Sequence, residues 1–199
     1  DKARVIDTEA RVHAAPDRPL RVVAVEPLTG GRGKQAFYST VHDATAEQVA
    51  PQAVRIEVEG RLPVGQSTFE HAYTVYGNGD VHVEHSVSRK GDAPPGIPRI
   101  GMQMAIPDAY DEVSWYGRGP HENYWDRKTG AAVGQYSQSL TDFVTGYVRP
   151  QENANRTDVR WVAFTRDDGR GLLAIGDAPL SVSAWPYSQQ DLAEATHTP

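Results

Sequence analysis

The stretch from Trp115 to Arg127, WYGRGPHENYWDR, holds the densest group of side chains that could bind or transform a ligand. Its two glycines and its proline break any helix or regular strand, so we expect a shaped loop. Aromatic rings beside ionisable and amide groups suit polar, ring-shaped ligands such as sugars. The candidate carbohydrate-facing residues are His121, Glu122, Asn123 and Trp125. The alternative is a rigid loop whose buried charges pair with one another.

A second dense stretch, RPQENANRTDVRW, runs from Arg149 to Trp161 and adds further polar candidates. These are Arg149, Glu152, Asn153 and Arg156. We count them with the carbohydrate-facing set, because Arg, Glu and Asn side chains suit sugar hydroxyls. Asparagines in such loops also satisfy backbone groups through Asx-turns, which is the structural alternative for this stretch.

The carboxylates of these stretches, Glu122, Asp126 and Glu152, have the chemistry of a glycosidase pair. Retaining glycosidases hold two carboxyl groups ~5 Å apart, and inverting enzymes hold them ~6.5–9.5 Å apart. The same stretches contain several arginines, which are ready partners for carboxylates. An Arg–carboxylate pair lowers the carboxyl pKa and leaves it unsuited to be a general acid. We therefore predict structural salt bridges here and no catalytic residue.

The two stretches resemble the C-terminal, or small-chain, domain of family 2 β-galactosidases. Residues 115–127 match the family pattern W-x-G-x-G-P-x-E-N-Y-x-D-R, and residues 149–161 match R-P-Q-E-N-x-N-R-x-D-V-R-W. Residues 188–197 resemble a third pattern, S-x-Q-x-L-x-x-x-x-H. The resemblance is strong from Arg99 to His197 and weaker from Asp1 to Lys90.

The resemblance implies a non-catalytic piece of a larger enzyme that hydrolyses terminal β-D-galactosides with two glutamates. Those glutamates lie in a preceding (β/α)8 barrel, which this chain would buttress while helping to wall the sugar pocket. The chain alone is expected to be inactive. Its implied partners are the remaining domains, the galactoside in the assembled enzyme and other subunits of an oligomer.

The resemblance also implies that no cofactor belongs to this chain, since the Mg and Na of the parent family bind in other domains. The family's domain continues past the point matched by Pro199, with a Gly-rich segment whose Trp reaches the active site. We therefore expect a domain that is clipped at its C-terminus.

Alternating apolar and polar residues predict the strands that must position these loops. Expected strands cover residues 54–59, 69–76, 81–87, 100–106, 112–116, 160–165, 172–175 and 180–184. Gly77–Asp80 and Asp167–Gly169 read as hairpin turns. Ser188 with Asp191 resembles a capping box that starts a short helix through Glu194. A weaker helical signal runs from Ala44 to Val49.

Many short antiparallel strands and little helix predict an all-β fold, a large antiparallel β-sandwich with one short helix near the C-terminus. The resemblance specifies the galactose mutarotase-like type of sandwich. We expect residues 1–199 to form a single domain, with a weak internal boundary in the Gly/Pro-rich residues 90–98.

Composition excludes several classes of partner. The formal net charge of −6 argues against binding to a nucleic-acid backbone. No apolar stretch approaches the ~18 residues of a membrane span. The absence of cysteine removes disulfides and thiolate metal sites, but it fits any compartment, cytoplasmic or periplasmic, and so does not locate the protein. His71, His82 and His85 lack a diagnostic ligand spacing, so no metal site is predicted. Residues 30–34 lack the spacing of a phosphate loop.

Two other functions stay open at this point. The first is an autonomous aldose 1-epimerase, with His121 and Glu152 as the acid and base across a sugar ring. The second is a standalone carbohydrate-binding module, which requires an exposed Trp125 for stacking.

Overall fold

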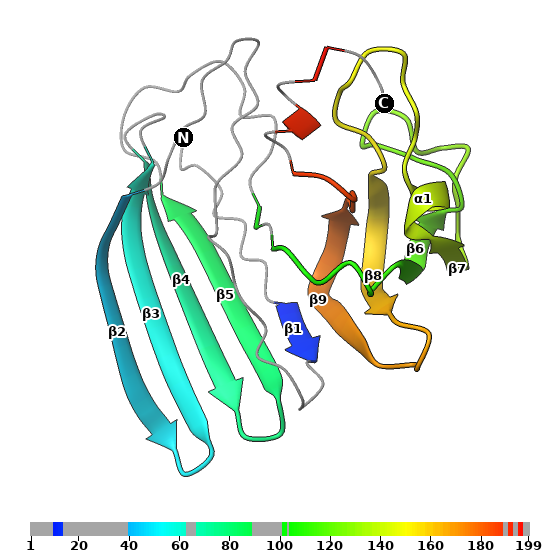
Figure 1. The fold of residues 1–199 in the computed structure, drawn as a ribbon. Helices are drawn as coiled ribbons and strands as arrows, with labels where there is room; N and C mark the ends of the chain where they lie inside the picture. Colours follow the sequence, from blue (N-terminus) through cyan, green and yellow to red (C-terminus); the bar gives the residue numbers. More distant parts are fainter. Residues whose placement is uncertain are drawn as a thin grey trace. The chain divides into compact units, whose positions relative to one another are not determined.

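In the computed structural model, contacts divide the chain into two compact units, residues 1–106 and residues 107–199, which are described separately (Figure 1). The described residues are 10–13, 40–62, 67–88, 101–102, 104–188, 191–192 and 195–196. They form two antiparallel sheets and one short helix, so the predicted all-β class is confirmed. The galactose mutarotase-like type stays a prediction. The predicted boundary at 90–98 and the residues 30–34 lie outside the described residues.

The sheet of unit 1 contains five antiparallel strands in the order β2-β3-β4-β5-β1. The strands are β1 (Ala10–His13), β2 (Thr40–Ala50), β3 (Ala53–Leu62), β4 (Ser67–Tyr76) and β5 (Asp80–Ser88). The predicted strands at 54–59, 69–76 and 81–87 fall within β3, β4 and β5. The predicted hairpin turn joins β4 to β5, and Gly79 adopts φ 92°, a backbone conformation that glycine allows without steric cost.

Two local predictions for unit 1 are wrong. The helical signal at Ala44–Val49 fails, because these residues lie in β2. Alanine, glutamate and glutamine favour helices locally, but pairing with β3 over nearly the full length of β2 overrides that preference. The strand expected at 100–106 is absent from its described residues, 101–102 and 104–106. Alternation alone does not make a strand where no neighbouring ladder accepts its backbone groups.

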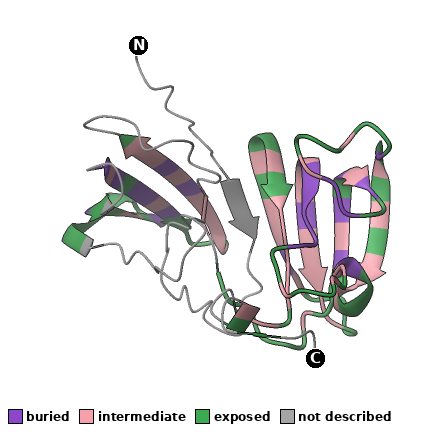
Figure 2. Cartoon of the chain, turned by 90° about the horizontal axis from the view of Figure 1, so that it is seen from above, coloured by how far each residue is buried: buried purple, intermediate pink, exposed green. Residues whose placement is uncertain are grey.

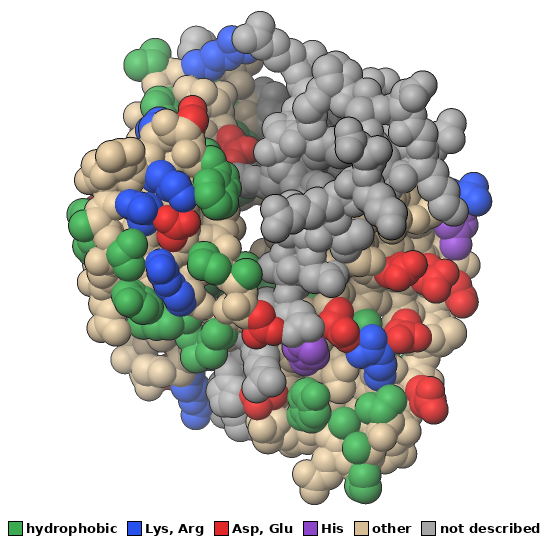
Figure 3. All heavy atoms as spheres, turned by 180° about the vertical axis from the view of Figure 1, so that it is seen from behind, with side chains coloured by type: hydrophobic (Ala, Val, Ile, Leu, Met, Phe, Trp, Pro, Cys, Tyr) green, Lys and Arg blue, Asp and Glu red, His purple; other side chains and the backbone are tan. Residues whose placement is uncertain are grey.

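One face of the unit 1 sheet is apolar and carries two histidines. Register places Val58 beside His71, and His71 beside His85. His71 and His85 are both buried, with ring centroids 4.4 Å apart. The opposite face is charged: Arg55 forms ion pairs with Glu57 and Glu84. Figure 3 shows acidic side chains, in red, near a basic one, in blue, on one part of the molecular surface.

The sheet of unit 2 has four antiparallel strands in the order β9-β8-β6-β7. The strands are β6 (Glu112–Gly119), β7 (Ala132–Ser139), β8 (Arg156–Thr165) and β9 (Gly171–Val182). Its core includes Val113, Trp115 and Val162. Buried residues of these strands appear as purple bands in Figure 2. The predicted hairpin at 167–169 joins β8 to β9. The expected strand 112–116 starts β6 and leads directly into the first dense stretch.

The helix α1 (Leu140–Phe143) follows β7 and was not predicted from the sequence. Ser139 caps it by accepting a hydrogen bond from the Asp142 N–H at 3.1 Å. Phe143 is buried and meets the Trp115 ring edge-on at 5.2 Å between centroids. The short helix therefore closes one side of the core.

The predicted capping box near the C-terminus is present. The Asp191 N–H donates to Ser188 Oγ at 3.1 Å, and the Ser188 N–H donates to Asp191 Oδ2 at 2.8 Å. Residues 191 and 192 are helical. Residues 189–190, 193–194 and His197 of that predicted segment lie outside the described residues.

Candidate functional site

Glu122 lies in the loop that follows β6 and is the central acceptor of the candidate site. Its side chain is buried, and its Oε1 accepts hydrogen bonds from the Arg127 guanidinium and the Tyr147 hydroxyl. Its Oε2 accepts the Ala154 N–H at 2.6 Å. Burial by itself would raise the pKa of Glu122, but the hydrogen bonds from Tyr147, Arg127 and Ala154 outweigh burial and hold this pKa below its ordinary value. Glu122 is therefore an ionised acceptor and a poor general acid.

Asn123 is fully buried and uses both ends of its amide. Its Oδ1 accepts from the Thr157 N–H at 2.9 Å and the Thr157 hydroxyl at 2.6 Å. Its Nδ2 donates to the His121 carbonyl at 3.0 Å. The backbone N–H of Asn123 also donates to the Asn155 carbonyl at 2.8 Å. The first stretch is thus fastened to the start of β8 by side-chain and main-chain bonds.

Asn153 connects the second stretch to two other segments. Its Oδ1 accepts the Thr145 N–H at 3.2 Å, and its Nδ2 donates to the Tyr187 hydroxyl at 3.1 Å. Its carbonyl accepts the Trp185 indole N–H at 3.0 Å. The loop after α1, the second stretch and the segment after β9 are therefore joined around one amide.

Arg156 is an almost completely buried cation between two aromatic rings. Its guanidinium carbon lies 4.2 Å from the centroid of Phe143 and 5.2 Å from that of Trp115. It donates to Gln138 Oε1 at 3.2 Å, while its Nε has no hydrogen-bond partner. Burial lowers the pKa of Arg156 to about 10, and the charge of Glu122 acts in the opposite direction. Arg156 stays cationic at neutral pH and places its charge inside the site's scaffold.

A second ionic cluster surrounds Asp158 at the start of β8. Arg118 Nε bonds to this carboxylate, and Lys128 Nζ lies 3.1 Å from Oδ1 and 3.2 Å from Oδ2. These hydrogen bonds, that from Arg118 foremost, hold the pKa of Asp158 below its ordinary value. Arg118 also donates to the Ala131 carbonyl at 2.8 Å. The cluster fixes the far half of the first loop.

Close backbone approach makes this arrangement possible. A Cβ on Gly117 would lie 2.8 Å from Val159 Cα, so only glycine fits where β6 passes β8. The register of β8 with β9 shifts between Arg156 and Trp161. Asp158, in this irregular segment, adopts φ 53°. The irregularity aims Asp158 at the loop cations.

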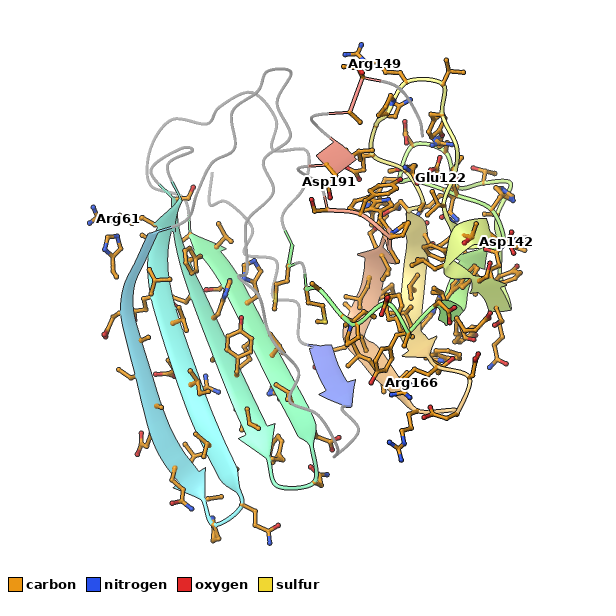
Figure 4. All side chains as sticks on the ribbon, viewed as in Figure 1. Arg61, Glu122, Asp142, Arg149, Arg166 and Asp191 are labelled. Carbon is orange, nitrogen blue, oxygen red and sulfur yellow. The ribbon has the colours of Figure 1, made fainter. Side chains whose placement is uncertain are left out.

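The structure divides the eight candidate residues into two groups. Glu122, Asn123, Asn153 and Arg156 are buried and belong to the connected scaffold. His121, Trp125, Arg149 and Glu152 are exposed. Figure 4 shows Arg149 at the outer end of its loop, apart from Glu122. Among the candidate carboxylates, Glu122 forms a salt bridge with Arg127, as predicted from the sequence. Asp126 and Glu152 lie on the surface.

Several residues of the site were missed by sequence reasoning. Tyr147 bonds to Glu122 and to Arg127, although it lies outside both dense stretches. Lys128 and Tyr187 likewise fall just outside the motifs. No local pattern marks these residues, because their roles arise from long-range contacts. For Tyr147, the only available signal was its position two residues before the second stretch.

The histidines of unit 1 do not extend this site. His71 and His85 lie side by side, whereas His82 lies opposite Thr74 on the other face of the sheet. Within the described ranges, no three His, Asp or Glu side chains converge in a way that would hold a metal ion. None of the described residues belongs to a helix long and apolar enough to cross a membrane.

Comparisons with known proteins agree with this arrangement of motifs. Residues 17–199 match the family model described as the β-galactosidase small chain. A β-galactosidase of Priestia megaterium is 44% identical over 151 residues, which are 75% of this chain and 14% of that protein. The β-galactosidase BgaC of Bifidobacterium adolescentis is 32% identical over 176 residues, 87% of this chain and 15% of that protein. The chain thus spans a small fraction of the curated relatives it matches, and it belongs to the β-galactosidase small-chain family.

Proposed function

We propose that this chain is a non-catalytic part of a family 2 β-galactosidase that buttresses the catalytic barrel and helps to wall the sugar pocket. In this proposal the whole enzyme hydrolyses terminal β-D-galactosides as an oligomer. The two catalytic glutamates and the metal ions lie in other domains, and this chain has no cofactor of its own. The chain covers only a small share of each β-galactosidase relative, which favours an accessory role within a larger enzyme.

The observation that carries the proposal is the state of Glu122. A catalytic acid must hold a proton near neutral pH, which requires a raised pKa. Glu122 instead accepts three hydrogen bonds, and its pKa is lowered. The best-placed carboxylate of the two motifs therefore serves the scaffold and not the chemistry.

A scaffold of this kind supports a pocket wall. Buried amide and ionic contacts fix the loops, while His121, Trp125, Arg149 and Glu152 remain on their surface. Fixed surface groups can orient a bound substrate without taking part in bond cleavage, because the loops lose little freedom on binding.

The test is hydrolysis of a chromogenic β-galactoside by this chain alone and by this chain mixed with a β-galactosidase that lacks its small-chain region. We expect no hydrolysis from either component alone and restored hydrolysis from the mixture. A matched control replaces the chain with a Glu122→Gln variant, in which the loops are loosened and restoration is expected to weaken. Hydrolysis by the isolated chain would refute the proposal and make Asp126 and Glu152 the suspects.

A further inference from the structure

Trp125 differs from the other three tryptophans in its exposure. Trp115 lies in the core, Trp185 donates its indole N–H to Asn153, and Trp161 is half-buried in β8. Trp125 is 71% exposed, the largest value among the described tryptophans and tyrosines. Burial of so large an apolar ring against a ligand would be favourable, because apolar surface is removed from water.

The segment that carries Trp125 is rigid. The Arg127 N–H donates to the Tyr124 carbonyl at 3.0 Å, which closes a tight turn with Trp125 and Asp126 at its tip. The Arg127 guanidinium lies 4.7 Å from the Tyr124 ring centroid and is paired with buried Glu122. The turn is therefore held in place before any ligand arrives, which reduces the entropy lost on binding.

Lys128 covers one face of the exposed ring. Its Nζ lies 3.9 Å from the ring centroid of Trp125 and is fixed by both carboxylate oxygens of Asp158. Contact with a fixed cation restrains the rotation of the indole and leaves its other face to meet a ligand. The arrangement is a one-sided aromatic platform.

The surroundings of the platform favour a sugar over a protein. The three residues that follow Trp125 along the chain, Asp126, Arg127 and Lys128, are charged, and the exposed His121 lies four residues before it. The core of a protein interface is depleted in charge and needs a contiguous apolar area. A pyranose needs one aromatic face for its C–H groups and polar side chains for its hydroxyls.

We infer that the open face of Trp125 stacks on a pyranose ring of a galactoside, with the exposed His121 and Asp126 of the same loop as hydroxyl partners. This inference deepens the proposed function and rests on it. It makes Trp125 a residue that sets substrate affinity and leaves bond cleavage to other groups.

The first test titrates the isolated chain with lactose and galactose and measures the heat of binding by isothermal titration calorimetry. We expect a saturable heat change that is absent in Trp125→Ala, and an affinity roughly 3- to 10-fold weaker in Trp125→Phe. The acyclic polyol sorbitol should cause no such change, because it has hydroxyls but no ring face. A matched control is Tyr76→Ala, which removes an aromatic ring of 42% exposure from unit 1 and should leave the titration intact.

The second test measures the assembled enzyme after complementation. We expect Trp125→Ala to raise KM for lactose roughly 3- to 10-fold with little change in kcat, since stacking contributes to binding. If Trp125→Ala has the same KM and the same sugar titration as wild type, the inference is overturned. Successful complementation by the wild-type chain would still uphold the proposed function in that case. If Trp125→Ala folds normally but abolishes complementation, Trp125 is a protein contact and the sugar inference is also overturned. Failure of the wild-type chain to complement would instead refute the proposed function.

Discussion

The carboxylate of Glu122 and the main-chain N–H of Ala154 are joined by a 2.6 Å hydrogen bond across 32 residues of sequence. Ala154 presents that N–H with a left-handed φ of 63° and is completely buried. The bond fastens the two motif loops of unit 2 to each other through one buried charge. Because the contact joins segments that are distant in sequence, a change at either end should loosen both loops.

Glu122→Gln should destabilise the chain by about 2 kcal/mol, the size of a lost charge-assisted hydrogen bond at a buried acceptor. The change removes the only charge that Arg127 is paired with in the structure's described part, and it weakens the field that favours cationic Arg156. The Arg127 side chain is 51% exposed, so water compensates its charge and the loss stays below that of a fully buried ion pair. Urea unfolding would measure the loss. The exposed Glu152→Gln should change stability by no more than about 0.5 kcal/mol, and equal effects of the two changes would contradict our account.

Ala154→Val should destabilise more than the same substitution at Ala131. Both alanines are buried, so each valine adds crowding that costs about 1–3 kcal/mol. Only Ala154 has positive φ, where a β-branched residue is strongly disfavoured. We expect the melting temperature of Ala154→Val to be several degrees below that of Ala131→Val. Equal melting temperatures would mean that the backbone at residue 154 relaxes without cost.

Asn123→Asp should destabilise although the two side chains have nearly the same shape. The new carboxylate cannot donate to the carbonyls of His121 and Arg118, which Asn123 Nδ2 contacts at 3.0 Å and 3.4 Å. A buried negative group facing two carbonyl oxygens costs about 2 kcal/mol or more. Guanidinium unfolding with wild type as reference would measure it, and a loss below about 0.5 kcal/mol would show that the amide donors contribute little.

Stability should fall as the solution is acidified from pH 7 to pH 5. Burial, with a smaller effect from His85, lowers the pKa of His71 from 6.5 to about 4, and burial also lowers the pKa of His85. The unfolded chain then binds more protons than the folded chain between these values, so stability is lost as pH falls through 6.5 toward 4. The contribution of His71 is about 2 kcal/mol between pH 7 and pH 5.

The check is urea unfolding at both pH values for wild type, His71→Leu and His85→Leu. Phe69 and Tyr73 flank His71 on β4 with ring centroids 4.8 Å and 6.2 Å away, so leucine enters a largely aromatic environment. Each variant should show a smaller difference between the two pH values than wild type. An unchanged difference in both would exclude the histidine pair as the source of acid sensitivity.

Strands and turns could be predicted from the sequence because their signals are local. Alternation located β3, β4 and β5, and glycine with asparagine or aspartate located both hairpins. Ala44–Val49 was mistaken for a helix because its residues favour helix locally, whereas pairing with β3 decides the outcome. Local patterns therefore fail where a long-range ladder provides the larger free energy.

The motifs located the candidate site, but they could not divide it into buried and exposed residues. Glu122 and Glu152 have the same chemistry and similar neighbours in sequence, yet only Glu122 is buried. The difference comes from Tyr147 and Ala154, which reach Glu122 across 25 and 32 residues. Such contacts depend on the register of β6 and β8, which sequence alone does not specify.

The amide cross-links around Asn123 have a consequence for how the molecule opens over time. The N–H groups of Asn123 and Thr157 are bonded across the two loops, in the same way that strand N–H groups are bonded in a ladder. An amide hydrogen exchanges with solvent only when such a bond breaks. The amide hydrogens of the loops at this site should therefore exchange with solvent as slowly as those of β8. The loops and that strand should open together as one cooperative segment.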